Sequence, residues 1–276
     1  MVPSRRQVLR LLPARTAQAL RGTDLALMGA GVTFYAALSA VPLLIVAARL
    51  ATAVVGIDRI RTLAETLSRA LPSALGADRV AEQVVVQAGT VPWLVAAVCV
   101  LPATLYGEGL RRAFRAVDAH NRATTERMTG WRGRAALLPL LAVTPLLLLA
   151  ILSLTPLLAR LFSGGSAPTA LGVYIALNVD WIVLALPLAY TFRVVAPDPP
   201  PLRAAVLGAL ATAAFLSGFL QGFVLFLSLP IDLGAPFGGA AAVGAVLALL
   251  LWLWLLHLVV LVGYVATVTA ARLRRP

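Results

Sequence analysis

The stretch Gly29–Leu44, GAGVTFYAALSAVPLL, lies within a charge-free run between Asp24 and Arg49 and decides the fold. An uncharged apolar run of roughly 20 residues is long enough to cross a lipid bilayer as an α-helix. A helix surrounded only by lipid has no need for glycine and hydroxyl-bearing residues. A helix packed against other helices does, because small residues allow close approach and hydroxyl groups in a membrane need partners. The stretch therefore predicts a membrane-spanning helix packed inside a bundle.

Two interpretations of this helix stay open. Its small and hydroxyl-bearing residues recur at helical spacing, which predicts one smooth face: Gly29, Thr33, Ala36, Ala37 and Ala40. Tyr35 and Ser39 are one turn apart and project together, and Pro42 predicts a kink that leaves a carbonyl group near residue 38 without its helical partner. Either the helix is closely packed and its hydroxyl groups bond within the protein, or Thr33, Tyr35 and Ser39 line a substrate cavity.

The composition of the 276-residue chain is typical of a polytopic membrane protein. Of its residues, 61% are hydrophobic and 12% are charged, whereas soluble domains carry about 25% charged residues. Apolar runs of spanning length recur along the chain, and backbone groups in lipid must be satisfied within their own segment, which favours helices. The predicted fold class is an all-α bundle of about six transmembrane helices, over 25–55, 91–106, 135–162, 170–194, 204–229 and 239–269.

The distribution of arginine predicts the orientation of these spans. The chain has 23 basic residues, all of them arginine, and a net charge of +12. Arginines gather before the first span, between the second and third spans, between the fourth and fifth spans, and at the end of the chain. Because positively charged connections stay in the cytoplasm, both termini are predicted to be cytoplasmic. We attribute the basic excess to this topology and expect no nucleic-acid partner.

The segments outside the spans have distinct predicted roles. Residues 1–24 are expected to form a basic amphipathic helix on the cytoplasmic surface, and residues 25–270 form the membrane domain. Within that domain, residues 56–90 form an external loop of two short amphipathic helices, and residues 107–134 form a cytoplasmic arginine-rich loop. Residues 271–276 form a basic cytoplasmic tail.

A carboxylate inside the fourth predicted span is the strongest candidate for a functional site. Asp180 lies about ten residues into that span, which at ~1.5 Å per residue places it near the middle of the membrane. A charge there costs ~3 kcal/mol or more, so the side chain should face the protein. Asn178 lies close to Asp180 in the sequence. The expected partners of Asp180 are His257 and Arg49. Gln221 lies beside the small residues of the fifth span. A site of transport and an ordinary interhelical hydrogen bond both stay open, and His257 by itself is typical of helix packing.

Charged residues after the second span suggest contacts with lipid headgroups. Glu108 precedes Arg111 and Arg112 by three and four residues, the spacing of an ion pair within a helix. Arg111, Arg112 and Arg115, together with Arg193 after the fourth span, are candidates for binding anionic headgroups.

The chain offers no constellation typical of an enzyme. Cys99 is the only cysteine, and the two histidines, His120 and His257, lack the spacing of metal ligands. Paired carboxylates and a Ser-His pair are also not visible. We therefore expect no catalytic residue, no metal, no cofactor and no enzymatic activity.

Several ordered motifs resemble the YihY/BrkB family of bacterial inner-membrane proteins. They are GLRRAFRAVDAHNR at 109–122, the group Tyr190, Phe192, Arg193 and Pro197, and PFGGAAAVGAVLALLLWLWLLHLVVLVGY at 236–264. The resemblance implies six spans, with both termini inside, in the inner membrane.

What the resemblance implies about activity is less definite. Members have been labelled virulence factors, proposed as envelope-lipid transporters, and once confused with a tRNA-processing ribonuclease. A metal-dependent nuclease needs clustered ligands that this sequence lacks. Members also carry acidic residues in the fifth and sixth spans, where this chain has Leu216-Ser217-Gly218 and Gly263-Tyr264-Val265. Whether that loss changes function stays open.

Two functions remain consistent with these sequence features. The first is a transporter or flippase-like protein for a lipid or other amphipathic envelope molecule, supported by kinked spans, small-residue faces and an internal carboxylate. The alternative is a non-transporting scaffold for an envelope-assembly complex. The expected partners are membrane lipids and envelope-assembly or lipid-bridging proteins, and the oligomeric state stays open.

Overall fold

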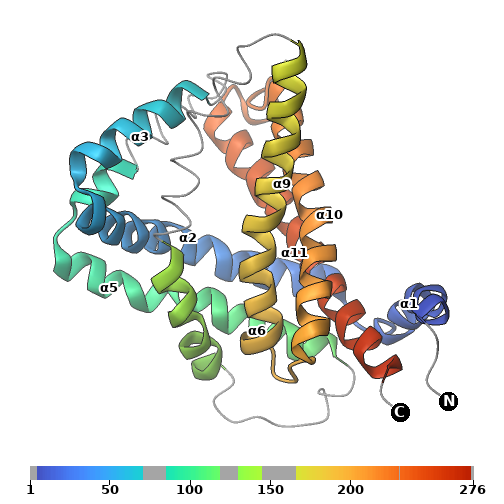
Figure 1. Cartoon of the computed structure of the whole chain (residues 1–276). Coiled ribbons are helices and arrows are strands. Elements are labelled where there is room, and N and C mark those ends of the chain that lie inside the picture. The colour runs from blue at the N-terminus through green and yellow to red at the C-terminus, as the bar shows by residue number, and fades with distance from the viewer. Residues whose placement is uncertain (1–4, 71–84, 119–129, 145–165, 230, 275–276) are drawn as a thin grey trace.

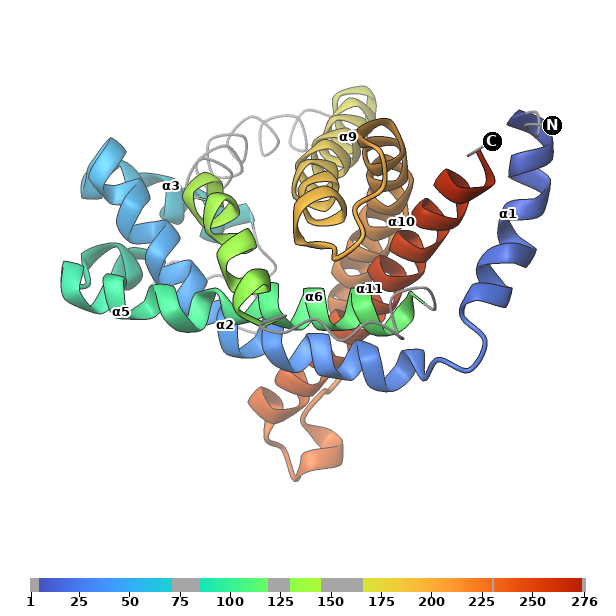
Figure 2. The same cartoon turned by 90° about the horizontal axis from the view of Figure 1, so that it is seen from below.

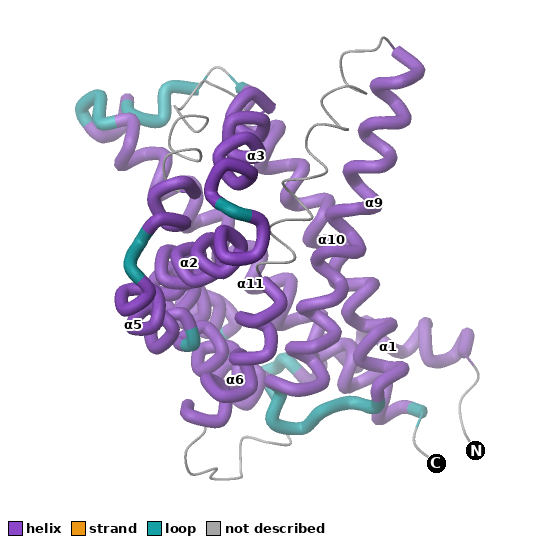
Figure 3. The backbone as a smooth tube through the Cα atoms, turned by 60° about the vertical axis from the view of Figure 1, so that its left-hand side comes forward, coloured by secondary structure: helices purple, strands orange, loops and turns teal. Residues whose placement is uncertain are grey.

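A computed structural model describes residues 5–70, 85–118, 130–144, 166–229 and 231–274, and the described chain is helical with short connections (Figure 3). Its named helices are α1 Arg5–Ala19, α2 Leu25–Val55, α3 Ile57–Ala70, α5 Trp93–Ala103, α6 Leu105–Val117, α9 Ser166–Tyr190, the π-helical turn η2 Thr191–Val195, α10 Leu202–Ser228, the 3-10 turn η3 Ala235–Phe237, and α11 Ala241–Leu273. Residues 85–90 and 130–144 are also helical. The all-α fold class is therefore confirmed for the described residues.

Five helical stretches within the described residues are long and apolar enough to cross a membrane: Leu25–Val55, Trp93–Val117, Leu177–Val195, Leu202–Phe223 and Ala241–Leu273. The first has the bounds that the sequence predicted. Of the predicted span 135–162, only the part up to residue 144 is described, and it is helical. A count of six spans therefore stays a prediction.

The helices form two antiparallel pairs that are joined by α11. α9 and α10 run side by side, and α2 lies against the consecutive helices α5 and α6 and crosses the first pair (Figures 1 and 2). α11 packs against both pairs, and α1 packs against α11. The N- and C-terminal ends of the described chain lie near each other at one end of the molecule (Figure 1).

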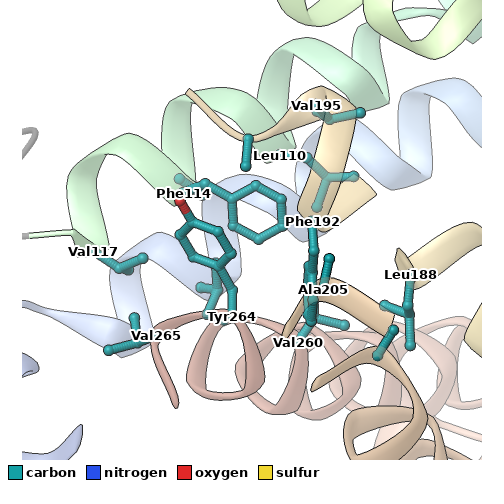
Figure 4. Packing of buried hydrophobic residues seen from close by; sticks show 14 of the residues in the cluster. Leu110, Phe114, Val117, Leu188, Phe192, Val195, Ala205, Val260, Tyr264 and Val265 are labelled. Carbon is teal, nitrogen blue, oxygen red and sulfur yellow. The ribbon is translucent and has the colours of Figure 1, made fainter. Parts of the chain in front are cut away.

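Three aromatic side chains form the centre of the core. The ring of Phe114 on α6 lies 4.3 Å from that of Tyr264 on α11 and 5.9 Å from that of Phe192 on η2, between ring centroids (Figure 4). All three side chains are fully buried. Aromatic pairs at such distances stabilise beyond their buried area by ~1 kcal/mol each. The three sequence motifs that resemble the YihY/BrkB family thus meet at one place.

The arginine-rich segment after the second span contributes to the core. Residues 107–134 were expected to connect two spans on the cytoplasmic side, and their first part continues α6 as a helix to Val117, with Leu110, Phe114 and Val117 in the core. Residues 119–129 lie outside the described part. The helix over 130–144 then crosses α6 so closely that a side chain at Gly107 would clash with the backbone of Gly133.

The segments expected to lie at the two membrane surfaces are helical where the structure describes them, and their placement at a surface stays a prediction. α3 is amphipathic, since Ile60, Leu63 and Ala64 are buried, and it packs on the end of α2. The second expected helix of the 56–90 loop is described only over residues 85–90. α1 buries Val8 and Thr16 and packs against α11. The predicted tail is shorter than expected, because α11 extends to Leu273.

Candidate functional site

The hydroxyl group of Ser39 fills a break in the second span. α5 ends at Ala103 just after Pro102, and α6 begins at Leu105. In a continuous helix the Tyr106 N–H would donate to the Pro102 carbonyl. Instead it donates to Ser39 Oγ at 2.9 Å, and Ser39 Oγ lies 3.1 Å from the Pro102 oxygen and 2.8 Å from the Tyr35 oxygen. Ser39 is thus inserted into the backbone ladder of a neighbouring helix, which is a known cause of helix breaks.

A second buried polar group joins α2, α6 and α11. His257 Nδ1 lies 3.0 Å from Thr33 Oγ1, and its Nε2 lies 3.2 Å from the hydroxyl oxygen of Tyr106. Thr33 donates its own proton to the Gly29 carbonyl at 2.8 Å. Thr33 therefore accepts from Nδ1–H, and Tyr106 donates to Nε2, which assigns a neutral imidazole with its proton on Nδ1.

These contacts favour the closely packed interpretation of α2. Ser39, Thr33 and His257 are buried, and the hydrogen bonds above satisfy their polar atoms. A side chain at Gly29 would clash with Leu258 of α11, and one at Gly109 would clash with Tyr35, so both glycines are needed for close approach. The expected smooth face is only partly correct, because Ala37 and Ala40 are exposed.

Asp180 lies between α9 and α10 and bonds with Gln221. Gln221 Nε2 donates to Asp180 Oδ2 at 2.7 Å. The expected partners are wrong, because His257 bonds with Thr33 and Tyr106, while the Arg49 guanidinium lies 4.0 Å from the centre of the Trp93 ring.

The neighbours of Asp180 are engaged with backbone groups. Asn178 donates to the Tyr174 carbonyl of its own helix, so its amide does not join the Asp180 pair. Trp181 donates to the Leu210 carbonyl at 2.7 Å and so links α9 to α10. Within the described residues, Gln221 is therefore the side chain that bonds with Asp180.

The four candidate headgroup-binding arginines differ in their surroundings. Glu108 forms the expected ion pair with Arg112 at 2.7 Å, and a second one with Arg134 at 2.7 Å. Arg111 is only 8% exposed and donates to the Val195 carbonyl at 2.8 Å, so this guanidinium group holds the end of η2. Arg115 is partly buried and Arg193 is exposed. Headgroup binding stays a prediction, and Arg112 and Arg193 are the exposed members of the four.

A charged cluster closes the core near the C-terminal end of α11. Arg272 binds Asp118 with two hydrogen bonds of 2.8 and 3.0 Å, and its Nη2 lies 3.4 Å from Asp198. Such two-pronged arginine–carboxylate contacts are among the strongest hydrogen bonds in proteins. The cluster fixes the end of α6, the η2–α10 connection and the end of α11 relative to one another.

A long apolar groove of about 740 Å³ lies between α1, α10 and α11. Its walls are built from residues at helical spacing: Leu207, Ala211 and Phe215 of α10, Leu258, Val262 and Ala266 of α11, and Leu9 and Leu12 of α1. Arg274 is the charged residue of the lining. The volume lies within the roughly 300–1,000 Å³ that is typical of ligand pockets.

The floor of the groove is a close crossing of α10 and α11. A side chain at Gly208 would clash with Thr267, and one at Gly263 would clash with Thr212. The two threonine hydroxyls donate to carbonyls of their own helices, at 2.8 Å to Gly208 and 2.7 Å to Gly263. The floor therefore leaves neither threonine hydroxyl without an acceptor, which suits a hydrocarbon chain.

Sequence reasoning missed Tyr106 and the groove. The small residues beside Gln221 that recur at helical spacing in the fifth span, Ala214, Gly218 and Gly222, do not form this crossing: nothing lies near Gly218, and Gly222 makes only an ordinary contact. A usable signal was present, because the spacing Gly-x-x-x-Thr occurs in both helices, at 208–212 and 263–267. Such small-residue spacing favours close helix crossing.

The family model described as Virulence factor BrkB matches residues 16–276, which is nearly the whole chain. No curated protein and no solved structure matches the chain at a significant level.

Proposed function

The chain belongs to the virulence factor BrkB family of integral membrane proteins, and from this premise we propose that it is a transporter or flippase-like protein for a lipid or another amphipathic envelope molecule. The observation that carries the proposal is the apolar groove between α1, α10 and α11. A hydrocarbon chain is not stabilised by a polar cavity. An apolar groove between membrane helices can hold a hydrocarbon chain, with the headgroup of the same molecule at the end of the groove.

The proposal includes a topology. We place the protein in the bacterial inner membrane with six spans, with both termini in the cytoplasm and α3 as part of an external amphipathic loop. The arginine distribution supports this orientation. The proximity of the two ends of the described chain agrees with it (Figure 1).

The Asp180–Gln221 pair is the proposed coupling site. α10 carries Gln221 and also one wall of the groove, so a change in the pairing of α9 with α10 would reach the groove. A carboxylate inside a membrane helix is costly and is typical of proton or ion coupling in transporters. Movement of the substrate would then be driven by an ion gradient.

Transbilayer movement of a fluorescent phospholipid tests the proposal. Proteoliposomes containing the purified protein are compared with protein-free liposomes, with and without a pH gradient, and dithionite reports the label in the outer leaflet. We expect faster movement with protein, and loss of this gain in Ala211→Trp, which fills the groove. Ala214→Trp, on an exposed part of the same helix that does not line the groove, is the matched control.

The outcomes separate transport from a scaffold role. Movement at the protein-free rate in both conditions would contradict transport and favour the scaffold. Equal movement in Ala211→Trp and Ala214→Trp would remove the groove from the pathway.

A further inference from the structure

One exposed arginine lines the end of the groove, and a second precedes the groove residues of α10. Arg274 lines it directly and follows the end of α11. Arg203 is exposed and comes one turn before Leu207, so it extends the row of groove residues Leu207, Ala211 and Phe215 along α10. The groove thus has an apolar length and a cationic end.

The register of the crossing places both arginines at the same end. Gly208 faces Thr267, and Thr212 faces Gly263, so α10 and α11 are antiparallel and residue numbers rise on one helix as they fall on the other. Continued by one turn, this register brings the start of α10 beside residues 271–274 of α11. Arg6, one turn before Leu9 on α1, is exposed too.

The positive charge at this end is not compensated by the neighbouring carboxylates. Asp118 and Asp198 are both engaged by Arg272. Within the described part of the chain, no ion pair involves Arg203 or Arg274. Two unpaired guanidinium groups at the end of an apolar groove complement a phosphate with an attached hydrocarbon chain.

The length of the groove fits one leaflet. From Arg203 to Phe215, α10 rises by ~18 Å at ~1.5 Å per residue, which is about half of the ~30 Å hydrocarbon core. A lipid held there would have its headgroup at the arginines and its acyl chain end near the middle of the membrane.

We infer that the groove binds a phospholipid with an anionic headgroup, held by Arg203 and Arg274, with one acyl chain along α10 and α11. This inference rests on the proposed function and names the substrate class of the same groove. It does not depend on whether the bound lipid is subsequently moved.

Native mass spectrometry of the purified protein tests this inference. The protein is mixed with equal amounts of phosphatidylglycerol and phosphatidylethanolamine that carry the same acyl chains. We expect one retained phosphatidylglycerol in the wild type, and about 30-fold weaker retention in Arg203→Gln/Arg274→Gln, since each arginine near an anionic lipid contributes roughly fivefold. Arg21→Gln/Arg59→Gln removes the same charge from exposed arginines outside the groove lining and should retain the lipid.

The other outcomes overturn the inference in distinguishable ways. Equal retention of the two lipids, or equal loss in the two double variants, would show that the groove does not select an anionic headgroup. A protein dimer without retained lipid would assign the groove to a second copy of the chain. Transport without headgroup preference would keep the proposed function and remove this inference, whereas selective retention without transport would do the reverse.

Discussion

At the scale of single residues, the hydroxyl group of Ser39 satisfies backbone atoms at the break that follows Pro102. Pro102 precedes the break between α5 and α6, and Ser39 of α2 supplies the bond that Tyr106 N–H lacks within its own helix. A polar backbone group left unpaired in a membrane is costly, so this one serine determines whether the break is tolerated. Ser39, in the Gly29–Leu44 stretch, therefore bonds with backbone groups of a neighbouring helix as well as with its own helix.

Ser39→Ala should destabilise the protein by about 1–3 kcal/mol, because a buried donor and acceptor both lose their partner. The measurement is the unfolding free energy in mixed micelles. Thr144→Ala is the control, since the Thr144 hydroxyl bonds only to the Leu140 carbonyl of its own helix. Equal stability of the two variants would show that Ser39 is not needed at the break.

Asp180→Asn separates charge from hydrogen bonding. The amide oxygen of asparagine can still accept from Gln221 Nε2, so we expect normal expression and stability. Lipid movement in proteoliposomes should be abolished if the carboxylate couples transport to an ion gradient. Normal movement by a folded Asp180→Asn protein would return Asp180 to ordinary helix packing.

At the scale of elements, the hydropathy of the sequence predicted the bounds of the spans better than it predicted the contacts between them. The bounds of α2 match the prediction, because length and apolarity are properties of one segment. The burial of Arg111 on α6 was not predicted, because the arginines of this segment were expected to be solvated. In the fold, Arg111 bonds with the Val195 carbonyl, and Glu108 pairs with Arg112 and Arg134.

The candidate site could be predicted only in part for the same reason. Thr33, Ser39, His257, Asp180 and Gln221 were all named from the sequence, since polar residues in apolar spans are conspicuous. Their partners depend on the register between helices, which no single segment determines. The pairing of Asp180 with Gln221 and of His257 with Tyr106 therefore had to come from the structure.

Gly208→Leu should disrupt the crossing of α10 and α11. A side chain there meets Thr267 on the facing helix, so the helices must separate, and we expect a loss of roughly 2 kcal/mol or more. Gly218→Leu, on the same helix with nothing nearby, should be neutral or slightly stabilising, because glycine is a poor helix former. The midpoint of thermal aggregation in detergent compares the two, and equal midpoints would contradict the proposed crossing.

At the scale of the whole molecule, the proposed topology makes a prediction about accessibility. In a Cys99→Ser background, single cysteines are introduced by Arg59→Cys in α3 and by Arg193→Cys in η2, both at exposed positions. A membrane-impermeant maleimide should label Arg59→Cys in intact spheroplasts, and Arg193→Cys only after permeabilisation. Labelling of both positions from one side would contradict the placement of α3 outside and η2 inside.

In the whole molecule, the groove is the region that we propose for substrate binding, because the other features described above hold the helices together. The buried polar groups at Ser39 and His257 are satisfied and hold α2, α6 and α11 together, while the core aromatic cluster joins α6, η2 and α11. The α1–α10–α11 groove combines apolar walls, a floor whose threonine hydroxyls are satisfied, and a cationic end. The helices that form the groove also pack against other described helices: α10 against α9, and α11 against α2 and α6.

The most direct test is a map of the groove with its occupant, from electron cryo-microscopy of the protein in lipid nanodiscs with a bound antibody fragment. We predict elongated density for the bound lipid, from the end of the groove at Arg203 and Arg274 along Leu207 and Ala211 to Phe215. A groove closed by α1, or filled by a helix of a second copy, would contradict it.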